Sequence, residues 1–368
     1  MSSVENTWII QRARNLGFPV CGITSVEPMS SAPLATWLDA GYGAGMEFLR
    51  RHMTLRADLS RVLPKAKSVI CVAMPYPGPQ STEITSGTIA SYARCADYHD
   101  VVRINLEALW NDISMRHVGE NARIFVDSGP LPERELARRA GIGWVGAHSC
   151  LIHPELGTRF VLGEILTTIE IQPSSPLQTS DACSACNACI HACPTNAIVA
   201  PGIIDARRCL SYLTIEHKGP IPREIRPLLG GRLFGCDTCQ NVCPHNRGAG
   251  RVLSELQPSA DLLNPDCKHI LTITAEQFKV RFTGTPIQRA KRRGLLRNAC
   301  IVLGNQRDET AIVPLRSAVH DNEPLIRGHA AWALGELGDQ SYLRKILQDE
   351  DDEWVRDEVQ SAIKTDGP

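Results

Sequence analysis

The chain has 368 residues and a net charge of -1, with 43% hydrophobic and 21% charged residues. This length has room for two or three domains, and the composition is that of a soluble globular protein. A charge near zero argues against attraction of the whole molecule to nucleic acid or membrane, although a local patch can still bind either. The longest apolar stretch, Ser68–Met74, is too short to span a bilayer, and the N-terminus lacks the basic start of a secretory signal. We therefore expect a cytoplasmic protein.

The first part of the chain, residues 1–175, has the pattern of an α/β domain. The predicted helices are Trp8–Leu16, Leu34–Ala40, Met46–Arg51, His99–Met115 and Arg134–Ala140, and the predicted strands are Val20–Thr24, Val69–Met74, Ile124–Val126 and Phe160–Ile171. Neither GxGxxG nor GxxxxGK[ST] is present, so no dinucleotide or NTP site is indicated.

Two aspartates of this part are candidates for acid chemistry. Asp127 follows an apolar strand and precedes a helix. This is a usual place for a catalytic residue in open α/β sheets, and equally for a turn or capping aspartate. Asp97 precedes the long helix with the same ambiguity, and for it capping is favoured.

The cysteines indicate a metal centre. The chain has 14 of them and no export signal, so we expect reduced thiols that bind metal or pack in the core. The run CxxCxxCxxxCP that begins at Cys183 is the one that binds a 4Fe–4S cluster in bacterial ferredoxins, where its fourth cysteine ligates the other cluster. A second group ends at Cys243 and has one cysteine fewer, and Cys209 makes up the deficit.

Two 4Fe–4S clusters then use eight cysteines. One cluster takes Cys183, Cys186, Cys189 and Cys243, and the other takes Cys193, Cys209, Cys236 and Cys239. The rival interpretation is structural zinc, but the first run holds too many closely spaced thiolates for one tetrahedral site. Two clusters transfer electrons and do no chemistry on carbon, so the rest of the chain must serve the acceptor.

The C-terminal part contains a repeat. Leu296-Arg297-Asn298-Ala299 recurs as Ile326-Arg327-Gly328-His329-Ala330, and a third unit starts at Val355-Arg356. Such helix pairs bury their faces only by stacking, so a short α-solenoid is predicted. The first unit carries a basic stretch made of Arg289, Lys291, Arg292, Arg293 and Arg297. On charge alone a solvated helix face is slightly favoured over phosphate contacts with nucleic acid.

The order of these parts resembles the epoxyqueuosine reductase family over nearly the whole chain. The matching segments are Ser91–Arg94 with Asp97–His99, Val126–Pro130 with Glu133 and Arg134, Ala140–Gly146, Leu162–Leu166, Arg208–Glu216 and Gly235–Pro244. Two departures are Ala147, where many members have Lys, and His245, where many have Trp.

The resemblance implies an oxidoreductase that reduces the epoxide of epoxyqueuosine to queuosine at the wobble position of tRNA. It implies cob(I)alamin fed by the two 4Fe–4S clusters, with Asp127 as proton donor and Asp97 as second candidate. The expected partners are the anticodon loop of the modified tRNA and an external low-potential electron donor, and we expect a monomer. Removing the oxygen takes electrons and protons, which low-potential clusters and a buried carboxylic acid can supply.

The implied architecture is α+β and multidomain. It has an α/β cobalamin-binding catalytic domain (1–175), a ferredoxin-like domain with two clusters (176–262) and HEAT-like helical repeats that bind tRNA (263–368). The implied cobalamin contacts are Arg50, Ala90, Asp97, Tyr98, Asp127 and Leu151. The implied tRNA contacts are His217, Arg289, Lys291, Arg292, Arg293 and Arg297.

Two alternatives remain at this point. One is a related corrinoid reductase that acts on a small molecule, for which the basic stretch and the solenoid would have no use. The other is an electron-transfer protein without its own substrate, which would not need a large domain ahead of the clusters.

Overall fold

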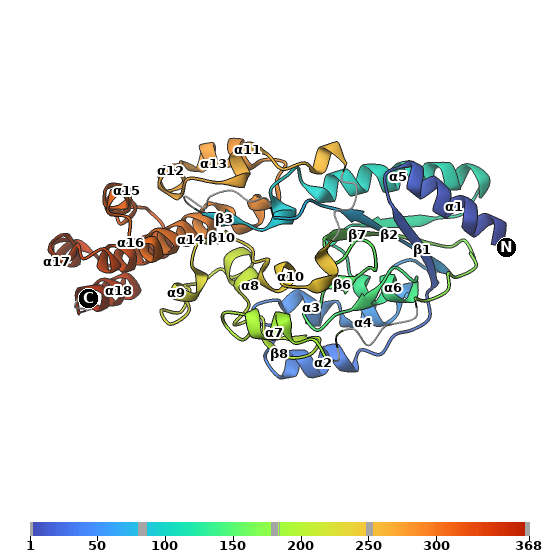
Figure 1. Ribbon diagram of the computed structural model, residues 1–368, viewed down its shortest axis with the longest axis horizontal. Coiled ribbons are helices and arrows are strands. Elements are labelled where there is room, and N and C mark those ends of the chain that lie inside the picture. Colours follow the sequence, from blue (N-terminus) through green and yellow to red (C-terminus); the bar gives the residue numbers. More distant parts are fainter. Residues whose placement is uncertain (1–2, 80–86, 178–182, 184, 248–252, 365–368) are drawn as a thin grey trace. The chain divides into compact units, whose positions relative to one another are not determined.

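The computed structural model describes residues 3–79, 87–177, 183, 185–247 and 253–364 (Figure 1). The chain forms two compact units, each made of three separate segments. The first unit contains residues 1–79, 95–207 and 238–257, and the second contains residues 80–94, 208–237 and 258–368. Among the described residues, no helix is long and apolar enough to cross a membrane.

The first unit is built on a four-stranded sheet with the order β1-β2-β7-β4. Its strands are β1 (Val20–Ser25), β2 (Ser68–Pro75), β4 (Ala122–Phe125) and β7 (Phe160–Thr167). All neighbours are antiparallel, so the sheet differs from the open α/β sheet expected from the sequence. The apolar run of β2 is buried at every position, which explains its continuous hydrophobicity.

Helices cover both faces of this sheet (Figure 1). On one face lies α5 (Tyr98–Arg116), and Gly163 of β7 has no room for a side chain because Val102 and Leu106 pack against it. On the other face, α6 (Glu133–Arg139) contributes Leu136 and Ala137 to a core that also contains residues of β2 and β4.

The remaining elements of the first unit are short, apart from the N-terminal helix. They are α1 (Ser3–Asn15), α2 (Ala32–Asp39), α3 (Glu47–Arg51), α4 (Met53–Ala57), β5 (Trp144–Val145), β6 (Leu151–Ile152), α7 (Ala188–Ala192), β8 (Ile198–Ala200), β9 (Ile203–Ile204) and α10 (Thr238–Asn241). The predicted helices and strands of residues 1–175 are confirmed within a few residues at their ends.

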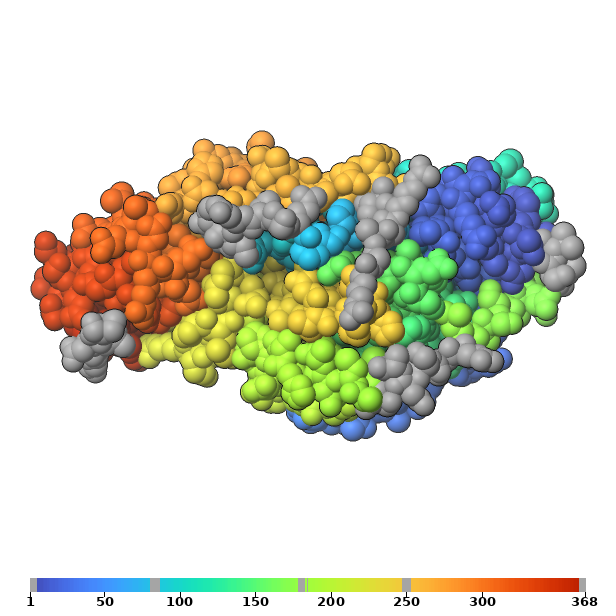
Figure 2. Space-filling view, in the orientation of Figure 1, coloured from blue at the N-terminus to red at the C-terminus, as the bar shows by residue number. Residues whose placement is uncertain are grey.

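The second unit consists of stacked helices and one small sheet. The parallel pair β3 (Thr88–Ile89) and β10 (Arg232–Phe234) lies with α8 (Leu210–Ile215), α9 (Arg226–Leu229), α11 (Ala260–Leu263), α12 (Cys267–Leu271) and α13 (Ala275–Phe282). The repeats follow as α14 (Lys291–Gln306), α15 (Ile312–Ala318), α16 (Pro324–Glu336), α17 (Gln340–Asp349) and α18 (Glu353–Lys364). Figure 2 shows the repeats, in orange and red, as one continuous surface.

Glycines of the repeat motif let these helices approach closely. A side chain at Gly304 would meet Trp332 and Ala333 of α16, and one at Gly335 would meet Ala362 of α18. The repeating Leu-Gly of the sequence is therefore a helix-packing signature, and the predicted solenoid is confirmed.

Residues 208–237 are tied to the repeats by buried polar side chains. Arg297 and Asn298 of α14 are fully buried. Arg297 donates to the carbonyl oxygens of Leu213, His217 and Gly219, and Asn298 donates to those of Thr214 and Leu233. A segment that we expected in the ferredoxin-like domain thus belongs to the same compact unit as the helices.

Candidate active site and cluster-binding cysteines

The first unit contains an open cavity of about 360 Å³. Tyr98, Asp127 and Leu151, three of the six residues expected to contact cobalamin, line it. Its other lining residues are Tyr76, Glu133, Arg134, His148, Ser149, Cys150, Thr158, Phe160, Val161, Leu162, Ile204 and Gln240. Apolar side chains from β7 and polar groups from the surrounding loops therefore meet in one place, as in many small-molecule sites.

Asp127 is held in an unusual conformation at this cavity. It follows β4 with φ +54, a left-handed backbone that few residues other than glycine adopt. Its side chain is 61% exposed, and its Oδ2 accepts a hydrogen bond of 2.8 Å from the hydroxyl of Tyr98. The Nε2 atom of His99 lies 3.4 Å from the same oxygen. An exposed carboxylate fixed in a strained turn is a typical arrangement for a functional group.

Asp97 caps α5 and also orients His99. Its carboxylate accepts from the backbone N–H of His99 at 3.0 Å and lies 2.7 Å from the ring Nδ1. Burial lowers the pKa of His99, but hydrogen bonds and charges from Asp127 and Asp97 outweigh this effect and raise the pKa to about 9. Burial raises the pKa of Asp97, but its hydrogen bonds to His99 outweigh burial, so the pKa lies below its ordinary value. The capping role favoured for Asp97 is confirmed, and a charged His99 links the two aspartates.

Two glutamates without a role in the sequence analysis lie next to Asp127. Glu133 is the first residue of α6, and Glu164 is fully buried on β7. Burial and the Asp127 charge raise the pKa of Glu133 to about 7, and burial together with Glu133 raises the pKa of Glu164 well above its ordinary value. Both lie in segments that carry the family resemblance, but sequence alone cannot show that α6 and β7 bring them together.

His148 presents a hydrogen-bond donor to the cavity. Its side chain is 2% exposed, and its Nδ1 accepts from the backbone N–H of Cys150 at 3.1 Å. Burial lowers the pKa of His148 to about 4, so the ring is neutral and carries its proton on Nε2. In the part of the chain that the structure describes, this buried Nε2–H has no partner.

The other expected cobalamin contacts lie elsewhere. Arg50 forms an ion pair of 3.0 Å with Asp39, and it does not line the cavity. Ala90 is a buried residue of the second unit, where it packs against Gly235.

Cysteines of the predicted cluster segment gather in the first unit. Cys183 and Cys243 pack with Trp144 and Ile152, and the electrostatic influence of Cys183 reaches both Cys189 and Cys243. Cys186 influences Cys243 in the same way. Among the described residues, no three His, Cys, Asp or Glu side chains converge closely enough to bind a single metal ion.

The other four cysteines are divided between the units. Cys193 and Cys239 belong to the first unit and pack near Ile198, whereas Cys209 and Cys236 belong to the second. The Sγ of Cys193 accepts from the N–H of Ala197 at 3.2 Å, a contact that would stabilise a thiolate.

A hydrogen-bond network connects the cavity wall to a cluster helix. Gln240 of α10 follows Cys239 and lines the cavity. Its Oε1 accepts from the hydroxyls of Tyr76 at 3.1 Å and Thr158 at 2.9 Å. The side chain of Asn246 donates to Thr158 and to the Gln240 carbonyl. The cysteine-bearing segment therefore forms part of the cavity itself.

Most of the predicted basic stretch is already engaged in the second unit. Arg289 forms a bidentate pair with Glu216, and Arg292 pairs with Asp321 at 2.6 Å. Arg293 donates to the carbonyl of Lys218. His217 lies next to this region and is 3.0 Å from the carbonyl of Pro220. Lys291 is exposed and has no ion-pair partner among the described side chains.

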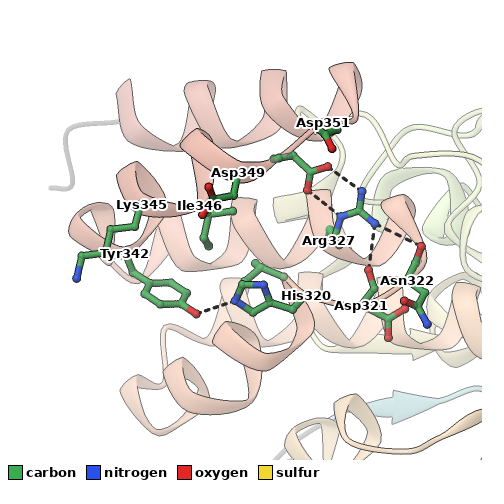
Figure 3. Close-up of a pocket in the computed structure, with 11 residues that line it drawn as sticks. His320, Asp321, Asn322, Arg327, Tyr342, Lys345, Ile346, Asp349 and Asp351 are labelled. Carbon is green, nitrogen blue, oxygen red and sulfur yellow. Dashed lines mark hydrogen bonds and ion pairs between the residues drawn. The ribbon is translucent and has the colours of Figure 1, made fainter.

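A second cavity, of about 450 Å³, lies among the repeats (Figure 3). Arg327 forms a bidentate pair with Glu350 there, and His320 contacts the hydroxyl of Tyr342. Its charged lining residues are Asp321, Asp349, Glu350 and Asp351 against Arg327 and Lys345. An excess of carboxylates does not suit a phosphate-binding surface.

The cysteine-bearing segment contributes to a cavity that is also lined by carboxyl groups. This combination is typical of an iron–sulfur oxidoreductase. Residues 56–128 match the family described as Epoxyqueuosine reductase QueG, DUF1730. Residues 182–246 match a 4Fe-4S double cluster binding domain, and residues 287–364 match HEAT repeats.

Three relatives extend the match to the whole chain. The epoxyqueuosine reductase of Escherichia coli (strain K12) is 40% identical over 338 residues, 89% of this chain and 88% of that one. A crystal structure of epoxyqueuosine reductase with a tRNA-Tyr epoxyqueuosine-modified stem loop covers 98% of both chains, with a TM-score of 0.91 and 33% identity. A Bacillus subtilis structure with its catalytic aspartate loop swung out of the active site covers the same share, with a TM-score of 0.92 and 32% identity.

The chain belongs to the epoxyqueuosine reductase family. It is an oxidoreductase whose cofactors are two 4Fe–4S clusters and cobalamin. The expected family, fold class and cofactors are thereby confirmed.

The residues of the first unit fit these groups chemically. Cobalamin carries amide side chains, and the buried Nε2–H of His148 is a donor for such an oxygen. The buried Nε1–H of Trp144, beside Cys183 and Cys243, also has no partner in the described ranges and can donate to a cluster sulfur.

Proposed function

We propose that the chain reduces the epoxide of epoxyqueuosine, in the anticodon loop of tRNA, to the alkene of queuosine, with Asp127 as the proton donor. One observation carries this proposal: an exposed aspartate is fixed by Tyr98 and His99 in a left-handed turn at the cavity. The relatives include one bound to a modified tRNA stem loop and one whose catalytic aspartate loop is swung out of the active site.

Asp127 acts on the departing oxygen, which gains negative charge as its bonds to carbon break. A positioned acid typically accelerates such a step by about 10²–10⁴-fold. Tyr98 and His99 orient the carboxyl group of Asp127 through its Oδ2 atom. His99 keeps its charge below a pH of about 9, so its Nε2 proton is available to return a proton to Asp127 after the reaction.

Cobalamin, when bound, supplies the low-potential electrons, and the clusters deliver them to it. Leu151 and the apolar residues of β7 exclude water from the cavity wall, and His148 donates to an acceptor on the cofactor. Asp97 acts only through His99, as a positioning residue.

The proposed ligands of one cluster are Cys183, Cys186, Cys189 and Cys243, which the mutual influence of these thiols supports. The proposed ligands of the other are Cys193, Cys209, Cys236 and Cys239, which rest on their spacing in the sequence. Anaerobically reconstituted protein is expected to hold about eight irons per chain. If Cys209→Ala keeps full iron and an unchanged EPR spectrum, this ligand assignment is wrong.

The proposed tRNA contacts are Lys291 and Arg293, with His217 beside them, because Glu216 neutralises Arg289. Arg297 is excluded by its burial, and Arg292 neutralises Asp321. We further propose a monomer that works in the cytoplasm with an external low-potential electron donor.

Anaerobic turnover with a modified stem loop tests the proposed activity. Protein loaded with both cofactors and a chemical reductant should remove one oxygen atom from the epoxyqueuosine base, as measured by mass spectrometry. An unchanged base in the presence of intact clusters and bound cobalamin would contradict the proposal.

A further inference from the structure

The reaction needs more protons than Asp127 holds. Removing an epoxide oxygen as water breaks two C–O bonds, forms one C=C bond and consumes two electrons and two protons. The electrons come from the external donor through the clusters and cobalamin. Asp127 passes on one proton at a time and must be recharged by its neighbours. His99 can supply one of the two protons, so the site needs a second source within the protein. This requirement rests on the epoxide reduction proposed above.

The side chains of Glu133 and Glu164 are buried together, and they can hydrogen-bond to each other only if one of them is protonated. Both oxygens of Glu164 and Oε1 of Glu133 are buried, and none of them has a donor among the described residues. Ionised carboxylates are acceptors only, so two of them cannot hydrogen-bond to each other. When one of them is protonated, its O–H can donate to the other, and the two side chains are close enough for this bond.

The sheet enforces this arrangement. Glu164 lies on β7 directly between Cys71 of β2 and Phe125 of β4, and α6 covers this face. No solvent reaches Glu164, which is 0% exposed. Two like charges confined to such a place repel each other with little solvent to screen them, so the resting pair retains one proton.

The same pair is connected to the catalytic loop. Glu133 lines the cavity with Asp127 and accepts a hydrogen bond from the Asp127 backbone N–H. The other charged groups that act on the pair are Arg56 of α4, which favours ionisation of Glu133, and Asp127 itself, which opposes it. The thiol of Cys71 is the remaining titratable neighbour, and burial keeps it neutral.

We propose that Glu133 and Glu164 form a proton-sharing pair that holds a proton for the Asp127 loop and supplies one of the two protons of epoxide reduction. In this step the O–H bond within the pair breaks, the proton moves towards Asp127, and both glutamates are left ionised. Bulk solvent restores the proton through Glu133, the half-buried member at the cavity. His99, whose Nε2 atom lies 3.4 Å from the Asp127 carboxylate, provides the other exchangeable proton.

Infrared spectroscopy of the cofactor-loaded protein tests the pair without substrate. The wild type should show the carbonyl band of a buried protonated carboxyl group at pH 6, and the band should weaken as the pH is raised. Glu164→Gln should remove the band, because the introduced amide donates to an ionised Glu133. Glu135→Gln, on the solvent side of α6, is the matched control and should retain it. Absence of the band from the wild type at pH 6 would overturn the proposal, whether or not any variant folds.

Turnover gives the second readout. Glu164→Gln should lower kcat at least tenfold, with tRNA KM, iron content and cobalamin binding unchanged. Full turnover by Glu164→Gln would overturn the role in proton supply. If the wild type itself leaves the epoxide intact while showing the infrared titration, the proposed reaction fails and the proton-sharing pair stands.

Discussion

At the scale of single residues, the site depends on side chains whose surroundings fix their protonation. His99 is charged because two aspartates face it, whereas His148 is neutral because burial disfavours its charge. The same residue type thus serves as a proton carrier beside Asp127 and as a hydrogen-bond donor in the cavity wall.

Asp127→Asn is expected to lose turnover by about 10²–10⁴-fold while retaining both clusters and cobalamin. Asparagine adopts the left-handed backbone with φ +54 readily, so the substitution removes the acid and leaves the turn in place. Stopped-flow turnover and the visible spectrum of bound cobalamin measure the two effects. A variant that neither folds nor binds cofactor would assign Asp127 a structural role, and near wild-type turnover would move the acid function to another group.

His148→Phe is expected to weaken cobalamin binding about tenfold without lowering protein stability. The buried Nε2–H has no partner among the described residues, and a buried unsatisfied donor costs about 1–3 kcal/mol. Phenylalanine removes that cost and the hydrogen bond to the cofactor, and the gain offsets the hydrogen bond from the Cys150 backbone N–H that is also lost. Visible-absorption titration with cobalamin gives the affinity, and thermal unfolding of the cofactor-free protein gives the stability. Unchanged affinity would show that His148 does not face the cofactor.

At the scale of elements, we expect the N-terminus of α5 to set the alkaline limit of the proposed reaction. Burial lowers the pKa of His99, and the facing carboxylates of Asp127 and Asp97 raise it to about 9. Because the pKa is raised on folding, this ion-pair contribution to stability is complete below pH 6.5 and is lost as the pH rises through about 9.

Asp97→Asn should move the alkaline limb of the rate–pH profile to lower pH by about one unit. The substitution removes one of the two charges that stabilise the imidazolium, while asparagine still caps α5. The profile of kcat/KM between pH 6 and 10 checks this shift, with Asp100→Asn in the first turn of the same helix as control. An unmoved limb would mean that His99 does not limit the rate.

The positions of helices and strands could be predicted from the sequence better than the contacts between them. The apolar run at β2, the turn before α5 and the Leu-Gly repeats each have a local cause, so they could be predicted from the sequence. The strand directions, the Glu133–Glu164 pair and the neutralisation of Arg289 and Arg292 depend on partners far along the chain. Glu216 and Asp321 lie outside the basic stretch. The number of basic residues in the stretch is therefore larger than the number of positive charges without an acidic partner.

At the scale of the whole molecule, tRNA binding is expected to depend on few free charges. Replacing Lys291 and Arg293 by Ala should reduce the slope of log affinity against log salt by roughly 0.7–0.9 for each phosphate that is no longer neutralised. Lys345→Ala, in the acidic cavity of Figure 3, is the control and should leave the slope unchanged. Fluorescence anisotropy with a labelled stem loop at several salt concentrations measures both. If the double variant keeps the parent slope, tRNA binds through another surface.

Breaking one buried ion pair should strongly destabilise the whole second unit. Arg226 is 1% exposed and forms a bidentate pair with Glu358 of α18 at 2.8 Å. Glu358→Ala leaves a buried charge without its partner, at a cost of roughly 3–5 kcal/mol. Thermal unfolding compared with Asp357→Ala, which removes only an exposed ion pair with Arg223, measures this loss. Equal melting temperatures for the two variants would contradict it.

The position of this ion pair along the chain also determines when the second unit can be completed during synthesis. Glu358 follows Arg226 by 132 residues, so Arg226 is synthesised long before its ion-pair partner. The first repeat helix likewise emerges well after the segment that its Arg297 and Asn298 hold. The folding of residues 208–237 therefore remains incomplete until α18 has been synthesised. Cys209 and Cys236 lie in this segment, so we expect iron to reach these two proposed ligands only after α18 has been synthesised.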